Sequence, residues 1–163
     1  PVADLGCGPG HVGAFLAGQG VEVLGLDLSA EMVAEARRAH PGLAFRQADI
    51  RRLGDAPGRY AGLLAMYALI HFDDRDLAAA LAACHAALRP AGELAVAIHL
   101  GEGVLHPGEM WGVPVTLGFR LFGEGEMEAR LEAAGFTVEE GFIREPYPGI
   151  EYPSRRAYLR ARR

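Results

Sequence analysis

Short apolar runs alternate along this chain with stretches in which apolar residues recur every three or four positions. The runs lie at the start of the chain and at residues 21–27, 43–47, 60–67 and 93–100. Apolar runs of this length, bounded by turn-forming residues, predict strands, and the longer period between them predicts amphipathic helices. Strands and helices in alternation predict an α/β fold built around a parallel sheet.

The helical stretches carry start and stop signals. The first covers residues 11–18, with Phe15 expected to face inward, and Ser29 is expected to cap a second helix that runs to His40. Acids crowd the start of a third helix near residue 73, where the helix dipole favours negative charge. Residues 124–134 predict a fourth helix. The apolar stripe of the third helix is formed by Leu77, Ala80, Leu81, Cys84 and Leu88.

The first strand runs into a glycine-rich turn, Asp4-Leu-Gly-Cys-Gly-Pro-Gly10. Glycine in a first strand-to-helix turn lets the backbone approach a ligand closely. Asp27 ends the second strand about 20 positions further on, where an acid can accept hydrogen bonds from both hydroxyls of a ribose. The two features together predict a site for an adenosine-containing cofactor.

The sign of the charge beside the glycines favours one cofactor over another. Residues 8–13 fit the dinucleotide pattern G-x-G-x-x-G, which cradles a pyrophosphate on a helix N-terminus. In the other register, Asp4 stands two positions before Gly6. A carboxylate there opposes a phosphate but suits the sulfonium and ammonium groups of S-adenosylmethionine. Asp4 therefore favours S-adenosylmethionine over NAD.

With these motifs the chain resembles the class I Rossmann-like S-adenosylmethionine-dependent methyltransferases. Residues 2–10 resemble the first motif of that family, and residues 23–29 with Met32 resemble the second. Residues 45–50 resemble the third, whose acid contacts the adenine amino group. Residues 60–71 resemble the fourth strand and its active-site edge, and residues 88–94 resemble the turn into the fifth strand, with Ala91 at a position that is commonly glycine.

The resemblance implies a doubly wound, three-layer α/β/α fold. Its sheet would be mostly parallel and would end in a pair of strands formed by residues 136–144 and 155–162, of which the last is antiparallel. Ala157, Leu159 and Ala161 alternate as they would on the buried face of that last strand. The cofactor site implied by the motifs comprises Asp4, Gly6, Cys7, Gly8, Gly10, Asp27, Leu28, Met32, Asp49, Ile50 and Met66.

Candidates for the acceptor side lie where strands four and five end. His71 follows the fourth strand, where a histidine could take a proton from the acceptor, although it could equally pack against the loop. Tyr67 could orient the acceptor or form a cavity wall. Residues 101–122 have no clean periodicity and are expected to form a substrate-facing cover that contributes His106 and Trp111. The spacing of the six histidines matches no zinc motif.

Composition narrows the class of protein. The chain is 50% hydrophobic with a net charge of −5, which argues against nucleic acid as a partner. All 16 basic side chains are arginine, so a catalytic lysine is excluded. There is no apolar run of membrane-spanning length and no visible signal peptide, and Cys7 and Cys84 do not suggest a disulfide. A cytoplasmic protein with a small-molecule acceptor is expected; the oligomeric state is left open.

Two other functions stay open at this stage. One is an NAD(P)-dependent oxidoreductase that uses the dinucleotide register, and the other is a non-catalytic cofactor-binding or regulatory domain of the same fold. The 163 residues are expected to form one domain. Because the chain begins inside its first strand, while the family normally has helices before it, this domain is expected to lack its N-terminal helix or helices.

Overall fold

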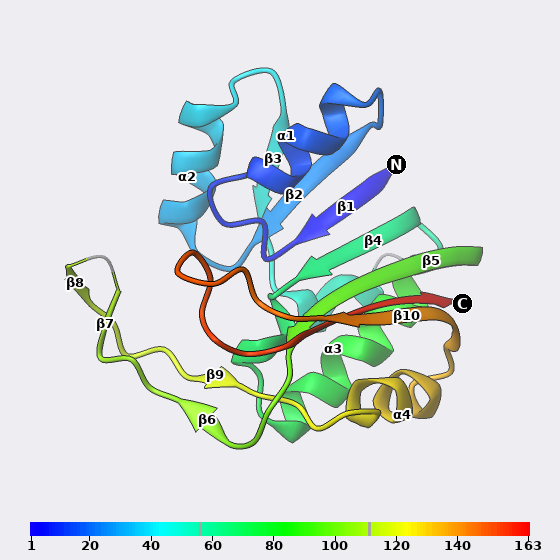
Figure 1. Cartoon of the computed structure of the whole chain (residues 1–163). Coiled ribbons are helices and arrows are strands. Elements are labelled where there is room, and N and C mark those ends of the chain that lie inside the picture. Colours follow the sequence, from blue (N-terminus) through cyan, green and yellow to red (C-terminus); the bar gives the residue numbers. More distant parts are fainter. Residues whose placement is uncertain (56, 111) are drawn as a thin grey trace.

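The computed structural model describes residues 1–55, 57–110 and 112–163. Seven strands form a central sheet in the order β10-β11-β5-β4-β1-β2-β3 (Figure 1). Strands β1 to β5 run parallel, whereas β11 is antiparallel to both β5 and β10. The strand bounds are β1 Val2–Leu5, β2 Val23–Asp27, β3 Ala44–Gln47, β4 Tyr60–Met66, β5 Leu88–His99, β10 Thr137–Arg144 and β11 Arg156–Arg162.

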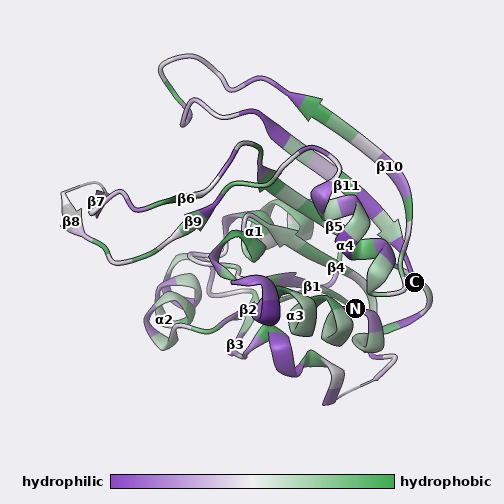
Figure 2. Ribbon diagram, turned by 90° about the horizontal axis from the view of Figure 1, so that it is seen from below, coloured by the Kyte–Doolittle hydropathy of each residue, from purple (hydrophilic) through white to green (hydrophobic). Residues whose placement is uncertain are grey.

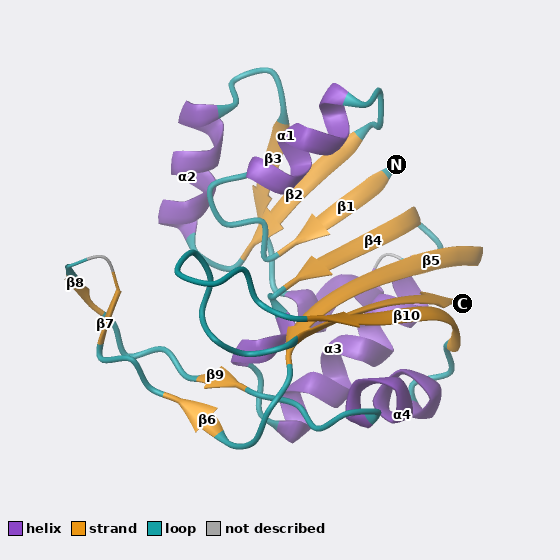
Figure 3. Cartoon of the chain, viewed as in Figure 1, coloured by secondary structure: helices purple, strands orange, loops and turns teal. Residues whose placement is uncertain are grey.

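Helices lie on both faces of this sheet (Figure 3), which confirms the doubly wound α/β/α prediction and the antiparallel last strand. In the part of the chain that the structure describes, the α-helices are α1 His11–Gly18, α2 Ala30–Ala39, α3 Asp74–Ala87 and α4 Glu126–Ala133, and the 3₁₀ helices are η1 Ile50–Asp55 and η2 Leu69–His71. Among the described residues, no helix has the length and apolar character that a membrane span needs.

Two apolar clusters hold the layers together. The larger joins the sheet to α3 and α4, and in Figure 2 its central strands and α3 are largely apolar. The predicted stripe of α3 is fully buried in this cluster, as are Ala157, Leu159 and Ala161 of β11. On the opposite face, Val33 and Ala36 of α2 pack with Phe45 of β3. Burial of apolar surface in these two layers is the main stabilising term of the fold.

The helix starts follow the predicted capping chemistry. The Ser29 hydroxyl accepts a hydrogen bond from the Met32 amide at 3.1 Å, and the Asp73 carboxylate accepts one from the Asp76 amide at 2.8 Å. Each side chain satisfies an amide that the first helical turn leaves without a partner. The acids at the start of α3 are therefore explained by capping and by the helix dipole.

One inward-facing prediction is wrong. Phe15 of α1 is 68% exposed, whereas Gly13 is the residue of that helix that is buried against the sheet. Because each residue advances about 100° around an α-helix, a side chain two positions beyond Gly13 points away from the sheet. The close approach of Gly13 to β1 thus fixes which face of α1 is buried.

Residues 101–122, here called the arm, leave the sheet after β5 (Figure 1). They pair into two short antiparallel ladders, β6 Val104–Leu105 with β9 Phe119–Arg120 and β7 Glu109–Met110 with β8 Val113–Pro114. Strands this short carry too few alternating positions to show a period in the sequence. The arm extends beyond the carboxyl ends of the central strands, where ligands bind in open α/β sheets.

Candidate functional site

The glycine turn links β1 to α1 at the point where the strand order reverses. Gly6, Gly8 and Gly10 have φ values of +62°, +50° and +86°, a left-handed conformation that other residues rarely adopt. A Cβ atom on Gly6 would lie 2.6 Å from the Cβ atom of Ala68, just past the end of β4. A Cβ atom on Gly8 would meet nothing within 4 Å. The turn therefore closes on β4 at Gly6 and leaves open space at Gly8.

Asp4 lies beneath the start of α1 and is only 2% exposed. Its Oδ2 atom accepts a hydrogen bond from the Gly13 amide, in the first turn of α1, at 3.1 Å. Burial raises the pKa of this carboxyl to about 6, against the lowering effect of the Gly13 hydrogen bond, and the charge of Asp27 raises it further. Asp4 thus occupies an amide of the kind that a dinucleotide pyrophosphate would need.

Asp27 ends β2 and holds the glycine turn from the other side. Its Oδ2 atom accepts the Gly8 amide at 2.8 Å, and its Oδ1 atom accepts the Ser29 amide at 2.9 Å. Each carboxylate oxygen has two lone-pair sites, so each retains one for a ligand hydroxyl. Beside Asp27, the side chains of Leu28 and Met32 are 61% and 45% exposed and offer an apolar surface.

Asp49 and Ile50 follow β3 but make different contacts. Arg51 donates to both carboxylate oxygens of Asp49, from Nε at 3.0 Å and from Nη2 at 2.7 Å, and these bonds lower the pKa of Asp49. Arg51 also donates to Asp76. The side chain of Ile50 is part of the apolar core. The adenine contact predicted for Asp49 would therefore share its carboxylate with Arg51.

Cys7 and Met66 are also predicted cofactor residues, and their surroundings limit their chemical roles. Cys7 is buried, and burial, followed by the charges of Asp4 and Asp27, raises the pKa of its thiol to about 12. The thiol is therefore protonated at neutral pH and is not a nucleophile. Met66 ends β4 and lines a small cavity with Phe142 and Tyr158.

Tyr67 continues the chain beyond β4 in a left-handed conformation, with φ of 60°. Its ring stacks on His99 with centroids 4.7 Å apart, and its hydroxyl lies 2.8 Å from that of Tyr158. Burial, followed by the Tyr158 hydrogen bond, raises the pKa of Tyr67. Tyr67 is therefore held as a neutral, positioned ring and is unsuited to act as a base.

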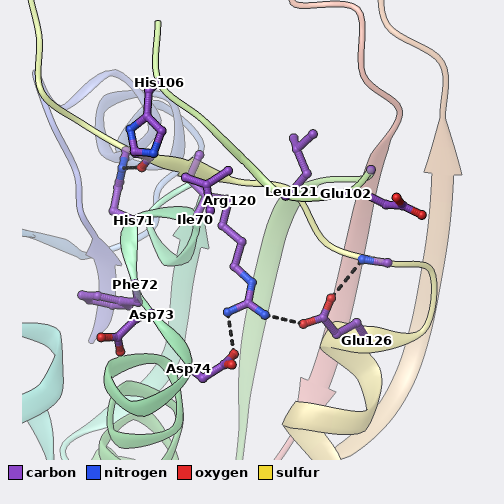
Figure 4. A pocket seen from close by; sticks show the side chains of 15 residues that line it. Ile70, His71, Phe72, Asp73, Asp74, Glu102, His106, Arg120, Leu121 and Glu126 are labelled. Carbon is purple, nitrogen blue, oxygen red and sulfur yellow. Dashed lines mark hydrogen bonds and ion pairs between the residues drawn. The ribbon is translucent and has the colours of Figure 1, made fainter. Parts of the chain in front are cut away.

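His71 ends η2 and faces the arm. Its Nδ1 atom lies 3.1 Å from the carbonyl oxygen of Gly118, and its ring meets Phe119 edge-on at 5.0 Å. It lines a cavity of about 750 Å³ between the arm and the start of α3 (Figure 4), as does His106. Trp111 lies outside the described residues.

Ion pairs organise the wall of that cavity. Arg120 of β9 donates to Asp74 at 2.6 Å and to Glu126 at 2.7 Å, and Figure 4 shows the three side chains converging. Arg130 of α4 pairs with the same two acids. This network ties the base of the arm to α3 and α4, so these charges serve the structure of the arm.

The structure describes no group of three or more histidine, cysteine, aspartate or glutamate residues within residues 1–55, 57–110 and 112–163 that could hold a metal ion. The groups that surround the glycine turn are instead the carboxylates of Asp4 and Asp27, backbone amides, and the exposed apolar side chains of Leu28 and Met32. Such a set fits a ligand with ribose hydroxyls, a cationic group and a flat base, and it opposes a pyrophosphate.

Comparison with known families decides the class. A family model described as a methyltransferase domain matches residues 2–92, more than half of the chain. The chain belongs to this methyltransferase family. The match covers the glycine turn, Asp27, Asp49 and the start of β5, the regions on which the resemblance rested. The predicted class and its cofactor, S-adenosylmethionine, are confirmed at the level of the family.

Curated methyltransferases match parts of the chain. A trans-aconitate 2-methyltransferase of Methylobacterium nodulans is 52% identical over 58 residues, which is 34% of this chain and 22% of that protein. A malonyl-[acyl-carrier protein] O-methyltransferase of Enterobacter lignolyticus is 38% identical over 94 residues, 58% of this chain and 37% of that protein. The chain thus spans well under half the length of these relatives.

Solved structures match the whole methyltransferase fold. An S-adenosylmethionine-dependent methyltransferase from Methanosarcina mazei aligns with a TM-score of 0.85 at 17% identity, covering 99% of this chain and 91% of that one. A 1,6-didemethyltoxoflavin-N1-methyltransferase from Burkholderia thailandensis, solved with bound 1,6-didemethyltoxoflavin and S-adenosylhomocysteine, aligns with a TM-score of 0.78 at 26% identity, covering 99% of this chain and 70% of that one.

At the carboxyl end of β5, the structure brings together residues that no sequence motif indicated. Tyr152 and Ser154, from the loop before β11, meet His99 at the end of β5. The sequence could have indicated His99, because it stands at the carboxyl end of a predicted strand. The loop residues carried none, because only the antiparallel return of β11 beside β5 places them there.

Proposed function

We propose that this methyltransferase domain transfers a methyl group from S-adenosylmethionine to a small-molecule acceptor. The observation that carries the proposal is the pairing of Asp4 with the Gly13 amide, which fills the helix N-terminus with a carboxylate. An acid in this place suits a cationic cofactor and repels a pyrophosphate, so it supports methyl transfer over hydride transfer.

The chain's own residues would bind and orient the cofactor. Asp27 offers its remaining lone pairs to the ribose hydroxyls, while Leu28 and Met32 cover the base. Asp4 offsets the positive charge of the ammonium group, and Asp49 reaches the adenine amino group. When bound, S-adenosylmethionine supplies an activated methyl group, so the protein's contribution is position and the exclusion of water.

The names of several relatives support a small acceptor, because trans-aconitate, demethylmenaquinone and 1,6-didemethyltoxoflavin are small molecules, whereas the malonyl group of one relative's name is attached to a carrier protein. The cavities favour a neutral acceptor over a polycarboxylate. The larger cavity is lined by Asp73, Asp74, Glu102 and Glu126, and its lining guanidinium, that of Arg120, is already paired with two of these acids. A tricarboxylate would meet net negative charge there.

Calorimetric titration with S-adenosylhomocysteine tests the cofactor. We expect binding by the unaltered chain and a loss of roughly 10- to 100-fold in affinity for Asp27→Ala, since hydrogen bonds to a charged group contribute about 1.5–3 kcal/mol. Asp55→Ala, an exposed acid at the end of η1, is the matched control and should bind normally. Binding of NADH in place of S-adenosylhomocysteine would overturn the proposal.

A further inference from the structure

A second cavity, of about 400 Å³, lies between the base of the arm and the loop before β11. Four rings line it together with two aliphatic residues: His99, His106, Phe119, Tyr152, Leu105 and Pro107. Within the described part of the chain, no carboxylate or guanidinium is among its lining residues. A wall of this composition favours a flat, apolar or aromatic molecule that can stack on rings.

This pocket is adjacent to the cofactor turn through a short chain of contacts. Ala68 lies directly against Gly6 of the turn, and the neighbouring Tyr67 stacks on His99. The larger cavity is reached instead through η2 and the start of α3. Both cavities therefore lie within a few residues of the turn that would hold the cofactor, and the smaller pocket is joined to it by stacked rings.

His99 is held firmly at the inner end of this pocket. Its Nδ1 atom lies 2.8 Å from the hydroxyl oxygen of Ser154, and its ring is sandwiched between the stacked Tyr67 ring and the edge-on Tyr152 ring. Ser154 is itself buried, and its carbonyl oxygen accepts a hydrogen bond from Arg156 at 2.8 Å. When Nδ1–H donates to Ser154, the lone pair of Nε2 is left for a ligand.

We propose that His99 is the general base of the methyl transfer, and that the acceptor is a planar aromatic molecule with an ionisable hydroxyl that stacks in this pocket. The inference rests on the proposed methyltransferase function and adds the acceptor class and the base. His99 acts on the acceptor proton, whereas Ser154 is a positioning residue that fixes the ring and its tautomer.

The charges around His99 support a neutral imidazole. Burial, followed by the positive charge of Arg156, lowers its pKa, while the carboxylate of Glu151 opposes that lowering. Tyr67 and Tyr152, the other ionisable groups that pack on the ring, are phenols. Tyr67 has a raised pKa, so it carries no charge at neutral pH. A neutral histidine is the form that can accept a proton.

The proposed step balances as a direct displacement. The acceptor oxygen forms a bond to the methyl carbon, the carbon–sulfur bond breaks, and its electron pair stays on sulfur, which becomes a neutral thioether. The hydroxyl proton passes to Nε2 of His99, and the imidazolium then releases it to water. No oxidant, reductant or metal ion enters the balance.

4-Nitrophenol is a suitable probe, because its phenolate absorbs visible light and its phenol form does not. A base in the pocket would take the proton of the bound phenol and stabilise the phenolate beside the imidazolium. At fixed pH near neutrality we expect the ratio of bound phenolate to bound phenol to fall at least tenfold in His99→Gln, since a nearby opposite charge lowers a pKa by one to three. Ser154→Ala should give an intermediate ratio.

His85→Gln is the matched control. His85 lies on α3 against Phe136, away from both cavities, and its substitution should leave the ratio unchanged. A direct measurement on the unaltered protein does not depend on variants that fold: the ring nitrogens of His99, followed by NMR, should become protonated when 4-nitrophenol binds. An equal phenolate ratio in the unaltered protein and His99→Gln, or no binding of 4-nitrophenol, would overturn the proposal.

Calorimetry with S-adenosylhomocysteine on the same samples separates this proposal from the proposed function. His99→Gln should bind S-adenosylhomocysteine with unchanged affinity, because His99 makes no contact with the glycine turn in the proposed arrangement. Failure of S-adenosylhomocysteine to bind, alongside normal proton transfer from 4-nitrophenol, would count against the cofactor and leave the base in place. The reverse result would count against the base alone.

Discussion

The two sides of the carboxyl edge of the sheet are built by different means. On the side proposed to hold the cofactor, the residues come from short segments close together in the sequence, and local backbone hydrogen bonds set the geometry: the amides of Gly8 and Gly13 donate to Asp27 and Asp4. On the acceptor side, His99, Phe119 and Tyr152 come from three segments that lie far apart in the sequence. The first side depends on backbone conformation, and the second depends on tertiary packing.

The difference explains why family resemblance reaches one side only. A turn that needs left-handed glycines and an acid at a strand end tolerates few alternatives, so its sequence carries a motif. A pocket of stacked rings can be assembled from many residues on many loops. Methyl transfer requires the same cofactor geometry each time, whereas the acceptor pocket is free to vary with the acceptor.

The largest effect is expected from Gly6→Ala. Its Cβ atom would lie 2.6 Å from that of Ala68 in a left-handed conformation, with strain of about 1–2 kcal/mol and overpacking of about 1–3 kcal/mol. We expect the free energy of unfolding, measured by urea titration, to fall by about 2–5 kcal/mol. Gly18→Ala, at the end of α1, is the control. A Cβ atom added there would meet nothing within 4 Å, and the φ of Gly18 is not left-handed. Equal effects of the two changes would show that the cofactor side is no more constrained than an ordinary helix end.

How far the sequence predicts each region follows from the same contrast. The positions of β1 to β5 along the chain and the caps at Ser29 and Asp73 could be predicted, because each follows from a local pattern of apolar residues, glycines or capping side chains. Phe15 could not be placed, because the periodicity of α1 leaves its rotation open and only the Gly13 contact with Asp4 settles it.

The candidate site shows the same division. Asp4 and Asp27 meet the glycine turn as their spacing predicts, although their roles toward the cofactor stay predictions. The ion pair between Arg51 and Asp49 and the environment of His99 could not be predicted, because both depend on side-chain contacts that no motif encodes. The ladders of the arm are two residues long and leave no period to detect.

The pH dependence of stability, an effect of intermediate size, tests the burial of Asp4. Its pKa rises from 3.8 to about 6 in the folded protein, so between these values the folded chain holds a proton that the unfolded chain has lost. Stability should therefore fall as the pH rises from about 4 to 6, by up to about 3 kcal/mol for a difference of about 2 in pKa. Asp4→Asn should remove this contribution, as urea titrations across the pH range would show.

Cofactor affinity should also depend on Asp4, but binding should favour the ionised carboxylate, whereas burial favours the protonated form. The ammonium group of S-adenosylhomocysteine favours ionised Asp4, so affinity should weaken by up to tenfold for each pH unit below about 6. Calorimetry should show this dependence in the unaltered chain and lose it in Asp4→Asn. Asp49→Asn is the matched control, because the pKa of Asp49 is lowered and the group stays ionised in this range. A pH-independent affinity in the unaltered chain would place the ammonium group elsewhere.

The smallest effect is expected where the two sides meet. Arg51 forms ion pairs with Asp49, which follows β3, and with Asp76, at the start of α3. All three side chains are partly exposed. Exposed ion pairs contribute little, so Arg51→Ala should lower the free energy of unfolding by less than about 1 kcal/mol. The substitution also removes the guanidinium from both oxygens of Asp49, while the backbone amide of residue 51 still donates to Oδ1 at 2.9 Å. Affinity for S-adenosylhomocysteine should therefore rise, by roughly twofold on the scale of one weak, solvent-screened pair.

The double variant Arg51→Ala with Asp49→Ala gives this prediction its control. If Asp49 accepts the adenine amino group, the gain from Arg51→Ala must disappear when Asp49 is also removed, because the freed carboxylate is its cause. Calorimetry on the two single variants and the double variant isolates that coupling. A gain that persists without Asp49 would mean that Arg51 itself obstructs the cofactor, and the adenine contact would then have to come from another part of the turn after β3.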